Sequence, residues 1–157
     1  MWLAPRGRYV WANGHGKTRE PLGQGSSRKR LGDAGERLAA EHLRRAGYRV
    51  RALNYRCRAG EIDIVAEEAG DSVFVEVKTR RGEGYGLPEE AVTQASQQKL
   101  MAAAQTYLEA QGCADASWRV DVVAVALTPA GRAQEIRMYR HAISADRFFF
   151  FWIGAQP

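Results

Sequence analysis

The side chains with the clearest chemical potential are four charged groups at alternate positions in two neighbouring apolar segments. Glu61 and Asp63 belong to the first segment, and Glu76 and Lys78 belong to the second. Carboxylates that lie close together can bind a hard divalent cation, and Mg²⁺ is usually held by one or two carboxylates plus water and substrate phosphate. A lysine beside them can contact a bound water or a scissile phosphate. The four residues therefore point to metal-dependent phosphate chemistry.

A β-hairpin would bring these groups together, because both segments alternate β-branched or aromatic residues with polar ones. A hairpin closed about residues 69–70 pairs Asp63 with Glu76 and Glu61 with Lys78. Opposed side chains have Cβ atoms roughly 5 Å apart, and two negative charges at that distance repel by about 3 kcal/mol at an effective dielectric constant of about 20. A bound cation would offset this repulsion. The same register places four apolar side chains on one core face: Ile62, Ile64, Val75 and Val77.

A simpler interpretation places the same charged residues on the solvent side of an antiparallel hairpin, where a Glu-x-Lys sequence is ordinary. An aspartate in the preceding apolar strand, a turn of suitable length and flanking valines make the combination rarer. The pattern alone leaves both interpretations open.

Residues 31–46 have helical periodicity, and Gly47 is expected to end this helix. Gly32 and Gly35 are poor helix formers, so their presence suggests close approach to another element. Glu36 lies at the border of the apolar arc and is a candidate third carboxylate for the hairpin site. An acid favoured by the helix dipole in the first turn is the equally weighted alternative.

Polar residues around the hairpin are candidates for contact with nucleic acid. They occur in the expected loop at 54–60, in a glycine-rich loop at 79–88 and in a helix expected over 88–111. Ordinary solvation of surface side chains is the alternative for each of them. The candidates are Arg56, Arg80, Arg81, Gln94 and Lys99.

The chain has 157 residues, 45% of them apolar and 26% charged, which is typical of one globular domain. It has no apolar run of about 18 residues and no apolar segment typical of a secretory signal near its start. Its two cysteines form no paired spacing for zinc. We therefore expect a cytoplasmic protein without a membrane partner.

The net charge of +5 is concentrated at one end of the chain. Residues 1–30 contain seven Lys or Arg and one Glu, a balance of +6, so the remainder has a balance of −1. A basic arm can supply sequence-independent affinity for phosphates. The charge of the remaining chain gives no support to general polyanion binding.

Three segments are expected. Residues 1–30 are predicted to be a basic, disordered arm, residues 31–145 a folded domain, and residues 146–157 an aromatic tail that either completes the core or forms an association patch. Within the domain, 48–53 is expected to be an edge strand and 118–127 a central strand. Asp121 in that central strand is either a hydrogen-bonded structural residue or a neighbour of the site.

Taken together, the motifs resemble the PD-(D/E)xK nuclease superfamily, which includes restriction endonucleases and Holliday-junction resolvases. The resemblance is greatest to the YraN-type (UPF0102) family of predicted endonucleases, and it covers residues 30–144. The arm and the tail match nothing in that family. The resemblance rests on these runs: Leu31-Gly32, Gly35-Glu36, Gly47-Tyr48, Asn54-Tyr55-Arg56, Gly60-Glu61-Ile62-Asp63-Ile64-Val65-Ala66, Phe74-Val75-Glu76-Val77-Lys78-Thr79-Arg80 and Arg119-Val120-Asp121-Val122-Val123.

The resemblance implies an α/β fold with a restriction-endonuclease-like core, in which helices flank a mixed central β-sheet. It implies that Asp63, Glu76 and the backbone carbonyl of Val77 bind Mg²⁺ or Mn²⁺, and that Lys78 orients or activates the attacking water. Glu36 matches the helix glutamate that often completes such a site.

These observations lead to the hypothesis of a metal-dependent endonuclease that hydrolyses DNA phosphodiester bonds, with branched or damaged DNA among its candidate substrates. The first alternative is a nucleic-acid or protein binding module that keeps the nuclease fold without turnover. The second is a homodimeric scaffold that associates through the aromatic tail.

Overall fold

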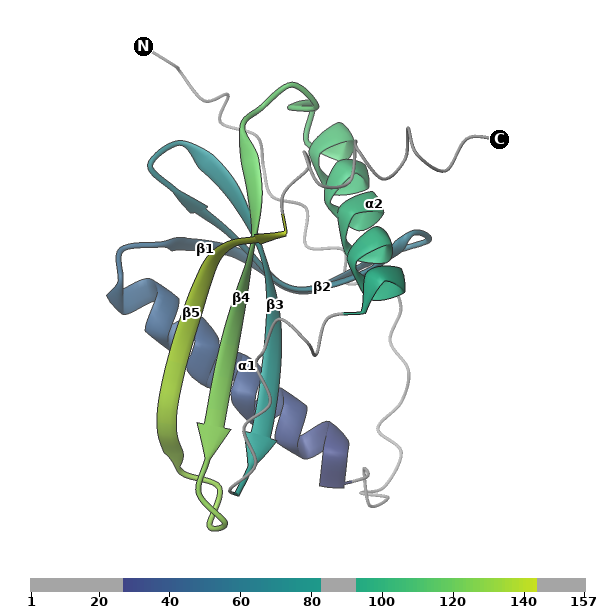
Figure 1. Cartoon of the computed structure of the whole chain (residues 1–157). Helices are drawn as coiled ribbons and strands as arrows, with labels where there is room; N and C mark the ends of the chain where they lie inside the picture. Colours follow the sequence, from purple (N-terminus) through teal and green to yellow (C-terminus); the bar gives the residue numbers. More distant parts are fainter. Residues whose placement is uncertain (1–26, 83–92, 144–157) are drawn as a thin grey trace, which may run out of the picture.

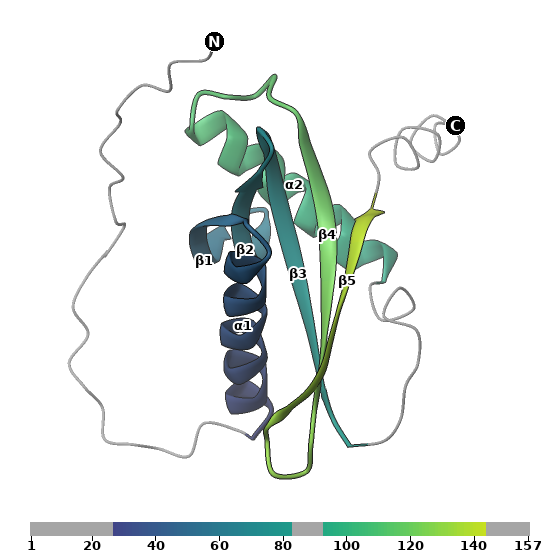
Figure 2. The same ribbon diagram turned by 90° about the vertical axis from the view of Figure 1, so that its left-hand side faces the viewer.

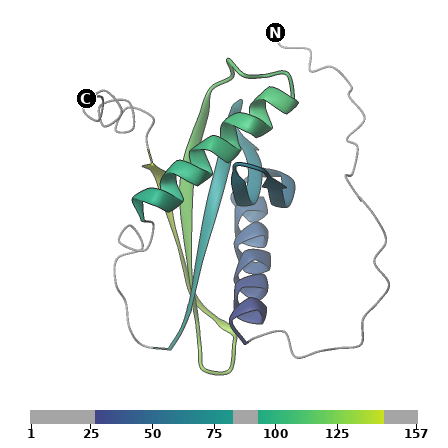
Figure 3. The ribbon, with the colours of Figure 1, turned by 90° about the vertical axis from the view of Figure 1, so that its right-hand side faces the viewer.

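The computed structural model describes residues 27–82 and 93–143, which form a five-stranded sheet with one helix on each face (Figure 1). Helix α2 crosses in front of the sheet in Figure 3 and lies behind it in Figure 2, whereas α1 packs on the opposite face. In chain order the elements are α1 (Ser27–Arg45), β1 (Arg49–Cys57), β2 (Gly60–Glu68), β3 (Asp71–Arg81), α2 (Gln94–Ala110), β4 (Trp118–Leu127) and β5 (Ala133–Ile143).

The strand order is β1-β2-β3-β4-β5. Strands β3 and β4 are parallel, and the other three neighbouring pairs are antiparallel. The parallel pair requires a crossover connection, and α2 lies within it. The prediction of an α/β fold with a mixed central sheet flanked by helices is confirmed, and the architecture is compatible with a restriction-endonuclease-like core.

Element ends differ from the sequence-based expectations in three places. Helix α1 begins at Ser27, four residues before the expected start. Strand β1 is an edge strand as predicted, but it continues to Cys57 through residues that we expected to form a loop. Helix α2 begins at Gln94 rather than at residue 88, because the Thr93 hydroxyl caps it by accepting a hydrogen bond from the Ser96 amide.

The hairpin of β2 and β3 has the predicted register over its outer half. Ile64 pairs with Val75, and Glu68 pairs with Asp71. Ala69 and Gly70 have φ of 52° and 91°, as a two-residue turn of type I′ requires. The turn therefore sets the register that carries the charged residues further along both strands.

Both faces of the hairpin are buried, which the sequence analysis did not predict. Ile64 and Val75 pack with α1 in one core cluster. Val65 and Phe74 are as fully buried in a second cluster beneath α2. Ile62 also belongs to this second cluster, so the prediction that it shares a core face with Ile64 is wrong.

Helix α1 lies unusually close to β3 because of Gly35. A Cβ atom added at Gly35 would lie 1.8 Å from the Thr79 hydroxyl oxygen, far inside any permitted contact. The close approach that we inferred from the small residues of this helix is confirmed at Gly35. It also brings the next residue, Glu36, toward the β2–β3 hairpin.

Substituting Gly35→Ala is expected to destabilise the protein by about 1–3 kcal/mol or more, because the added methyl group forces α1 away from Thr79. Gly32→Ala is the matched control, since its Cβ would meet nothing closer than a Glu36 oxygen at 4.0 Å. That control is expected to stabilise the helix by up to about 1 kcal/mol. Urea unfolding of both variants checks this, and equal effects would contradict the packing.

Several expectations concern residues outside the described ranges. They include residues 1–26 of the arm, most of the glycine-rich loop and the tail after residue 143. Across the described residues, neither helix combines the length and apolar character of a membrane-spanning segment.

Candidate functional site

Asp63 lies where β2 separates from β3. The regular pairing of the two strands ends at Ile64 and Val75. Beyond this point, the Val77 amide of β3 donates a hydrogen bond of 2.7 Å to Asp63 Oδ2 of β2. The predicted backbone pairing of Asp63 with Glu76 thus stops one position short, and the Asp63 carboxylate is inserted between the diverging strands.

The charge of Glu76 nevertheless acts on Asp63. Burial raises the pKa of Asp63 to about 7, and the negative charge of Glu76 adds to this shift. The Val77 hydrogen bond lowers the pKa, the Glu36 charge raises it, and Lys78 lowers it. Asp63 is therefore about half protonated near neutral pH. The repulsion between carboxylates that we expected from the sequence is present.

Lys78 forms an ion pair with Glu76 on the same strand. Its Nζ lies 2.7 Å from Glu76 Oε1, and the two side chains are 28% and 18% exposed. The predicted register set Glu61 opposite Lys78, but the pairing of β2 with β3 ends before these residues. Glu61 instead accepts a hydrogen bond of 2.9 Å from Arg56 of β1, because the β1–β2 register places those two residues opposite each other.

Glu36 reaches the same region from α1. Burial raises its pKa, and a hydrogen bond from the Asn54 amide lowers it. Asp33 and Glu61 raise the pKa of Glu36 further, and Arg56 lowers it. Glu36 in turn contributes to the raised pKa of Asp63. Glu36, Glu61, Asp63 and Glu76 therefore form one acidic region, although Glu36 is far from the others in the sequence.

The donor set fits a divalent cation held by few protein ligands. Asp63 and Glu76 offer carboxylate oxygens, and the carbonyl of Val77, which lies between Glu76 and Lys78, is the further ligand that the resemblance implies. Within residues 27–82 and 93–143, no three His, Cys, Asp or Glu side chains gather to hold an ion. The Glu36 charge acts on Asp63, and the part of Glu36 as a third carboxylate of the site stays a prediction. Mg²⁺ commonly accepts such a site because water and phosphate fill its other positions.

The candidate nucleic-acid contacts come from three elements, β1, β3 and α2. Arg56 is 73% exposed and pairs with Glu61. Arg80 and Arg81 are exposed at the end of β3, whereas Gln94 and Lys99 are exposed on α2. The structure places all of them on the surface, and their contact with nucleic acid stays a prediction.

Asn54 was missed as a candidate by the sequence analysis. It has a φ of 51°, a left-handed conformation that Asn tolerates better than most residues. In the register of β1 with β2 it lies between Leu53, which pairs with Ile64, and Tyr55, which pairs with Ile62. It therefore faces Asp63. The signal in the sequence was weak, because an asparagine in an expected loop is ordinary.

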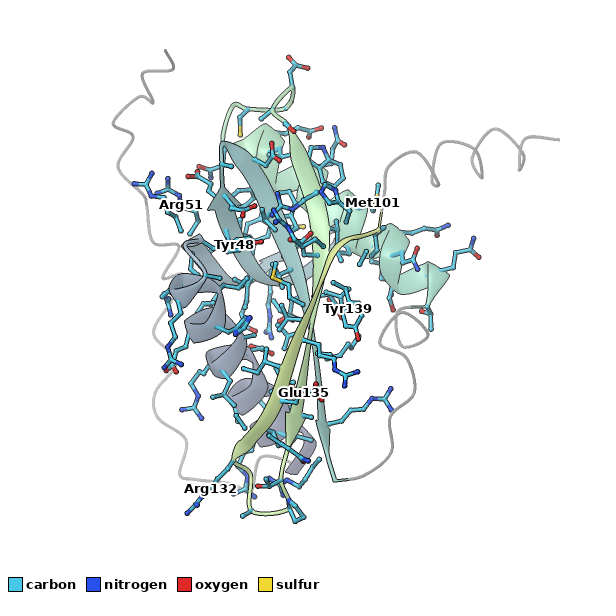
Figure 4. All side chains as sticks on the ribbon, turned by 60° about the vertical axis from the view of Figure 1, so that its left-hand side comes forward. Tyr48, Arg51, Met101, Arg132, Glu135 and Tyr139 are labelled. Atoms are coloured by element: carbon cyan, nitrogen blue, oxygen red, sulfur yellow. The ribbon has the colours of Figure 1, made fainter. Side chains whose placement is uncertain are left out.

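Asp121 belongs to a separate structural network. It is fully buried, and its Oδ1 accepts hydrogen bonds from Arg119 Nε at 3.2 Å and from the His141 amide at 2.9 Å. Arg119 also donates to the Tyr48 hydroxyl. Figure 4 labels Tyr48, which lies well away from Arg132 in the turn between β4 and β5. The interpretation of Asp121 as a hydrogen-bonded structural residue is confirmed.

Comparisons with known proteins agree on one family. The model of "Uncharacterised protein family UPF0102" matches residues 35–125, which include all four candidate catalytic residues. A UPF0102 protein of Roseiflexus castenholzii is 51% identical over 110 residues, covering 69% of this chain and 87% of the relative. One from Symbiobacterium thermophilum is 49% identical over 117 residues, covering 74% and 98%. One from Geobacter sulfurreducens is 47% identical over 108 residues, covering 68% and 84%. The chain therefore belongs to the UPF0102 family, the YraN-type family that its motifs predicted.

Proposed function

We propose that this protein is a divalent-metal-dependent endonuclease that hydrolyses DNA phosphodiester bonds. The observation that carries the proposal is the group formed by Asp63, Glu76 and Lys78. Burial, together with the charge of Glu76, raises the pKa of Asp63 to about 7, and Lys78 Nζ lies 2.7 Å from Glu76 Oε1. A fold that retains this repulsion gains from a cation that removes it.

The protein's own residues have distinct parts in the proposed reaction. Asp63, Glu76 and the Val77 carbonyl would hold the cation, which supplies polarisation of the phosphoryl oxygen and a lower pKa for its water. The ammonium group of Lys78 is positioned to donate a hydrogen bond to water or to a phosphate oxygen near Glu76. Its positive charge would stabilise the charge that develops on the phosphate.

The bond between the Val77 amide and Asp63 Oδ2 fixes one carboxylate oxygen and leaves the other available as a ligand. Glu36 increases the negative potential at Asp63 from the α1 side. The Val77 bond favours the charged carboxylate. The Glu36 charge attracts a proton and a divalent cation alike, but its attraction for the doubly charged cation is stronger. The near-neutral charge of residues 31–157 gives little general attraction for DNA. Affinity in the proposed complex therefore depends on the cation, on local contacts and on the basic residues 1–30.

Cleavage of end-labelled DNA tests the proposal. Purified protein is incubated with single-stranded, linear duplex and four-way-junction DNA in Mg²⁺, in Mn²⁺ or in EDTA. We expect cleavage that requires the metal and falls by about 10²-fold or more in Asp63→Ala and Lys78→Ala, because each removes a group that stabilises the transition state. Glu109→Ala is the control, since it removes an exposed carboxylate at the far end of α2.

Three outcomes would contradict the proposal. Equal cleavage by wild type and both variants would identify a contaminating nuclease. Cleavage in EDTA would exclude the cation from the reaction. DNA binding without cleavage would indicate the non-catalytic module that the sequence analysis kept as its alternative.

A further inference from the structure

A cavity of about 420 Å³ lies beside the acidic region, between the first half of α1 and strand β1. Small-molecule sites span about 300–1,000 Å³, so this space accommodates one base with its sugar. The cavity shares Glu36 with the acidic region. Its lining comprises Arg30, Asp33, Glu36, Arg37, Leu53 and Asn54.

The lining combines the groups that bind an isolated nucleotide. Arg30, Asp33 and Arg37 are spaced at i, i+3 and i+7, so they lie along one face of α1. The two arginines form no ion pair with any described residue, and guanidinium groups bind phosphate in a bidentate manner. Asp33 and the amide of Asn54 can exchange hydrogen bonds with the edge of a base.

Leu53 adds an apolar contact. It is 44% exposed, and within the described ranges it is the large hydrophobic residue that stands out as exposed. One exposed leucine is ordinary by itself. At this position, however, it lies in the wall of the cavity beside Asn54, whose φ of 51° departs from the conformation of an ordinary strand. An apolar side chain beside base-edge donors and acceptors is suited to the face of a base.

The register joins this cavity to the proposed reaction centre. Leu53 pairs with Ile64 and Tyr55 pairs with Ile62, so Asn54 faces Asp63 across the two strands. Asn54 also donates a hydrogen bond to Glu36. A nucleotide in the cavity would therefore lie next to a phosphate held at Asp63 and Glu76.

We propose that this cavity, defined by Arg30, Asp33, Glu36, Arg37, Leu53 and Asn54, is a subsite for one unpaired nucleotide adjacent to the scissile phosphate. The inference rests on the proposed function. The bases of a duplex are stacked and paired, so a base can enter such a cavity only when it is extruded or already unpaired. Extrusion costs a few kcal/mol and an unpaired base avoids that cost, so the subsite selects DNA with unpaired nucleotides.

Fluorescence anisotropy of labelled DNA tests the subsite. Full-length protein is titrated in Ca²⁺ with three probes: a paired duplex, the same duplex with an unpaired bulge, and the bulge with abasic sugars in place of its nucleotides. Gels confirm that the probes stay intact. We expect the bulge with bases to bind about tenfold more tightly than either of the other two probes.

Two variants and one control separate the subsite from general charge effects. Leu53→Ala is expected to reduce the preference for the bases about fivefold, because it removes most of the apolar contact. Arg37→Ala is expected to weaken binding to the bulge, whereas Arg44→Ala is the control, since it removes the same charge from an exposed position of α1 outside the cavity. Circular dichroism checks that each variant is folded.

Equal binding of the bulges with and without bases would overturn the subsite. Equal effects of Arg37→Ala and Arg44→Ala would also overturn it. If wild type cleaves DNA in Mg²⁺ but has no preference for bases, the subsite fails and the proposed nuclease stands. If it prefers bases but cleaves no probe, the cavity binds unpaired nucleotides and the nuclease proposal fails.

Discussion

Replacing Arg119 by methionine is expected to lower the free energy of unfolding by about 3–5 kcal/mol, because it leaves a buried carboxylate without its cation. Arg119 Nε lies 3.1 Å from Asp121 Oδ2, and the Asp121 side chain is fully buried. Arg119 also donates to Glu68 Oε2 at 2.7 Å and to the Tyr48 hydroxyl at 3.2 Å. One guanidinium group thus joins β4 to β2 and to Tyr48, which lies between α1 and β1.

The electrostatics of Arg119 agree with this expectation. Burial lowers its pKa, but the hydrogen bond to Glu68 and the charge of Asp121 more than offset that effect, so its pKa is raised. After substitution, the His141 amide would remain as the hydrogen-bond donor to Asp121 that the structure places there. The cost therefore comes from the unpaired Asp121 charge more than from the lost attraction.

Urea unfolding at neutral pH measures the effect, and Arg137→Met is the matched control. Arg137 pairs with Glu135 at 2.6 Å with the same two-residue spacing on a strand, but its side chain is 58% exposed. Exposed ion pairs contribute little to stability, because water screens the two charges. The double variant Arg119→Met with Asp121→Leu should recover part of the loss. Similar losses for Arg119→Met and Arg137→Met would contradict the role assigned to burial.

Substituting Asp63→Asn is expected to stabilise the metal-free protein by up to about 4 kcal/mol at pH 8. Burial and the Glu76 charge raise the pKa of Asp63 from 3.8 to about 7 in the folded state. A difference of about 3 pH units corresponds to about 4 kcal/mol at 1.36 kcal/mol per unit. Asparagine is neutral at every pH, and its side-chain oxygen can still accept the bond from the Val77 amide.

The direction of the pH dependence follows from proton binding. Between pH 3.8 and about 7, folded Asp63 holds a proton that the unfolded chain has released. The contribution of this bound proton to the free energy of unfolding is thus complete below pH 3.8 and is lost as the pH rises through about 7. We expect the variant and wild type to be similarly stable near pH 4 and the variant to be more stable at pH 8.

Urea unfolding in EDTA at pH 4 and pH 8 measures this difference. Glu61→Gln serves as the control, because Glu61 lies on the same strand but is 42% exposed and already paired with Arg56. A stability difference between wild type and Asp63→Asn that stays constant from pH 4 to pH 8 would mean that Asp63 is not under the proposed electrostatic strain.

Local sequence patterns predicted the hairpin well because local rules govern it. Alternation identified both strands, and the turn at Ala69 and Gly70 fixed their register near the turn. Gly35 indicated a close approach because only glycine fits against Thr79. The carboxylates and Lys78 lie on this hairpin, so much of the candidate site could be read from a single stretch of sequence.

Contacts that depend on the pairing of β1 with the hairpin could not be predicted from the pattern of the hairpin alone. Strand β1 pairs with the far side of β2, and its register assigns Arg56 rather than Lys78 to Glu61. The divergence of β2 from β3 moves Ile62 into the α2 cluster. The alternation of apolar and polar residues describes a flat pair of strands. The two features named above arise instead from the divergence of β2 from β3 and from the pairing of β2 with β1.

The region around Asn54 shows the same limit. Its sequence signature is that of an ordinary loop, and β1 extends through it because β2 provides a partner. Its left-handed conformation and its bond to Glu36 exist only in the folded protein. Family motifs identified the residue run that contains Asn54, but they gave no indication of the cavity beside it.

Calorimetry of Mn²⁺ binding in the absence of DNA tests whether Asp63 and Glu76 form a cation site. We predict one site at which binding releases protons at pH 7, because the pKa of Asp63 is about 7 and a ligand carboxylate must be deprotonated. Asp63→Asn and Glu76→Gln should abolish this binding, and Glu61→Gln should retain it. If Asp63→Asn and Glu76→Gln bound Mn²⁺ as tightly as the wild type does, these carboxylates would not be the cation ligands.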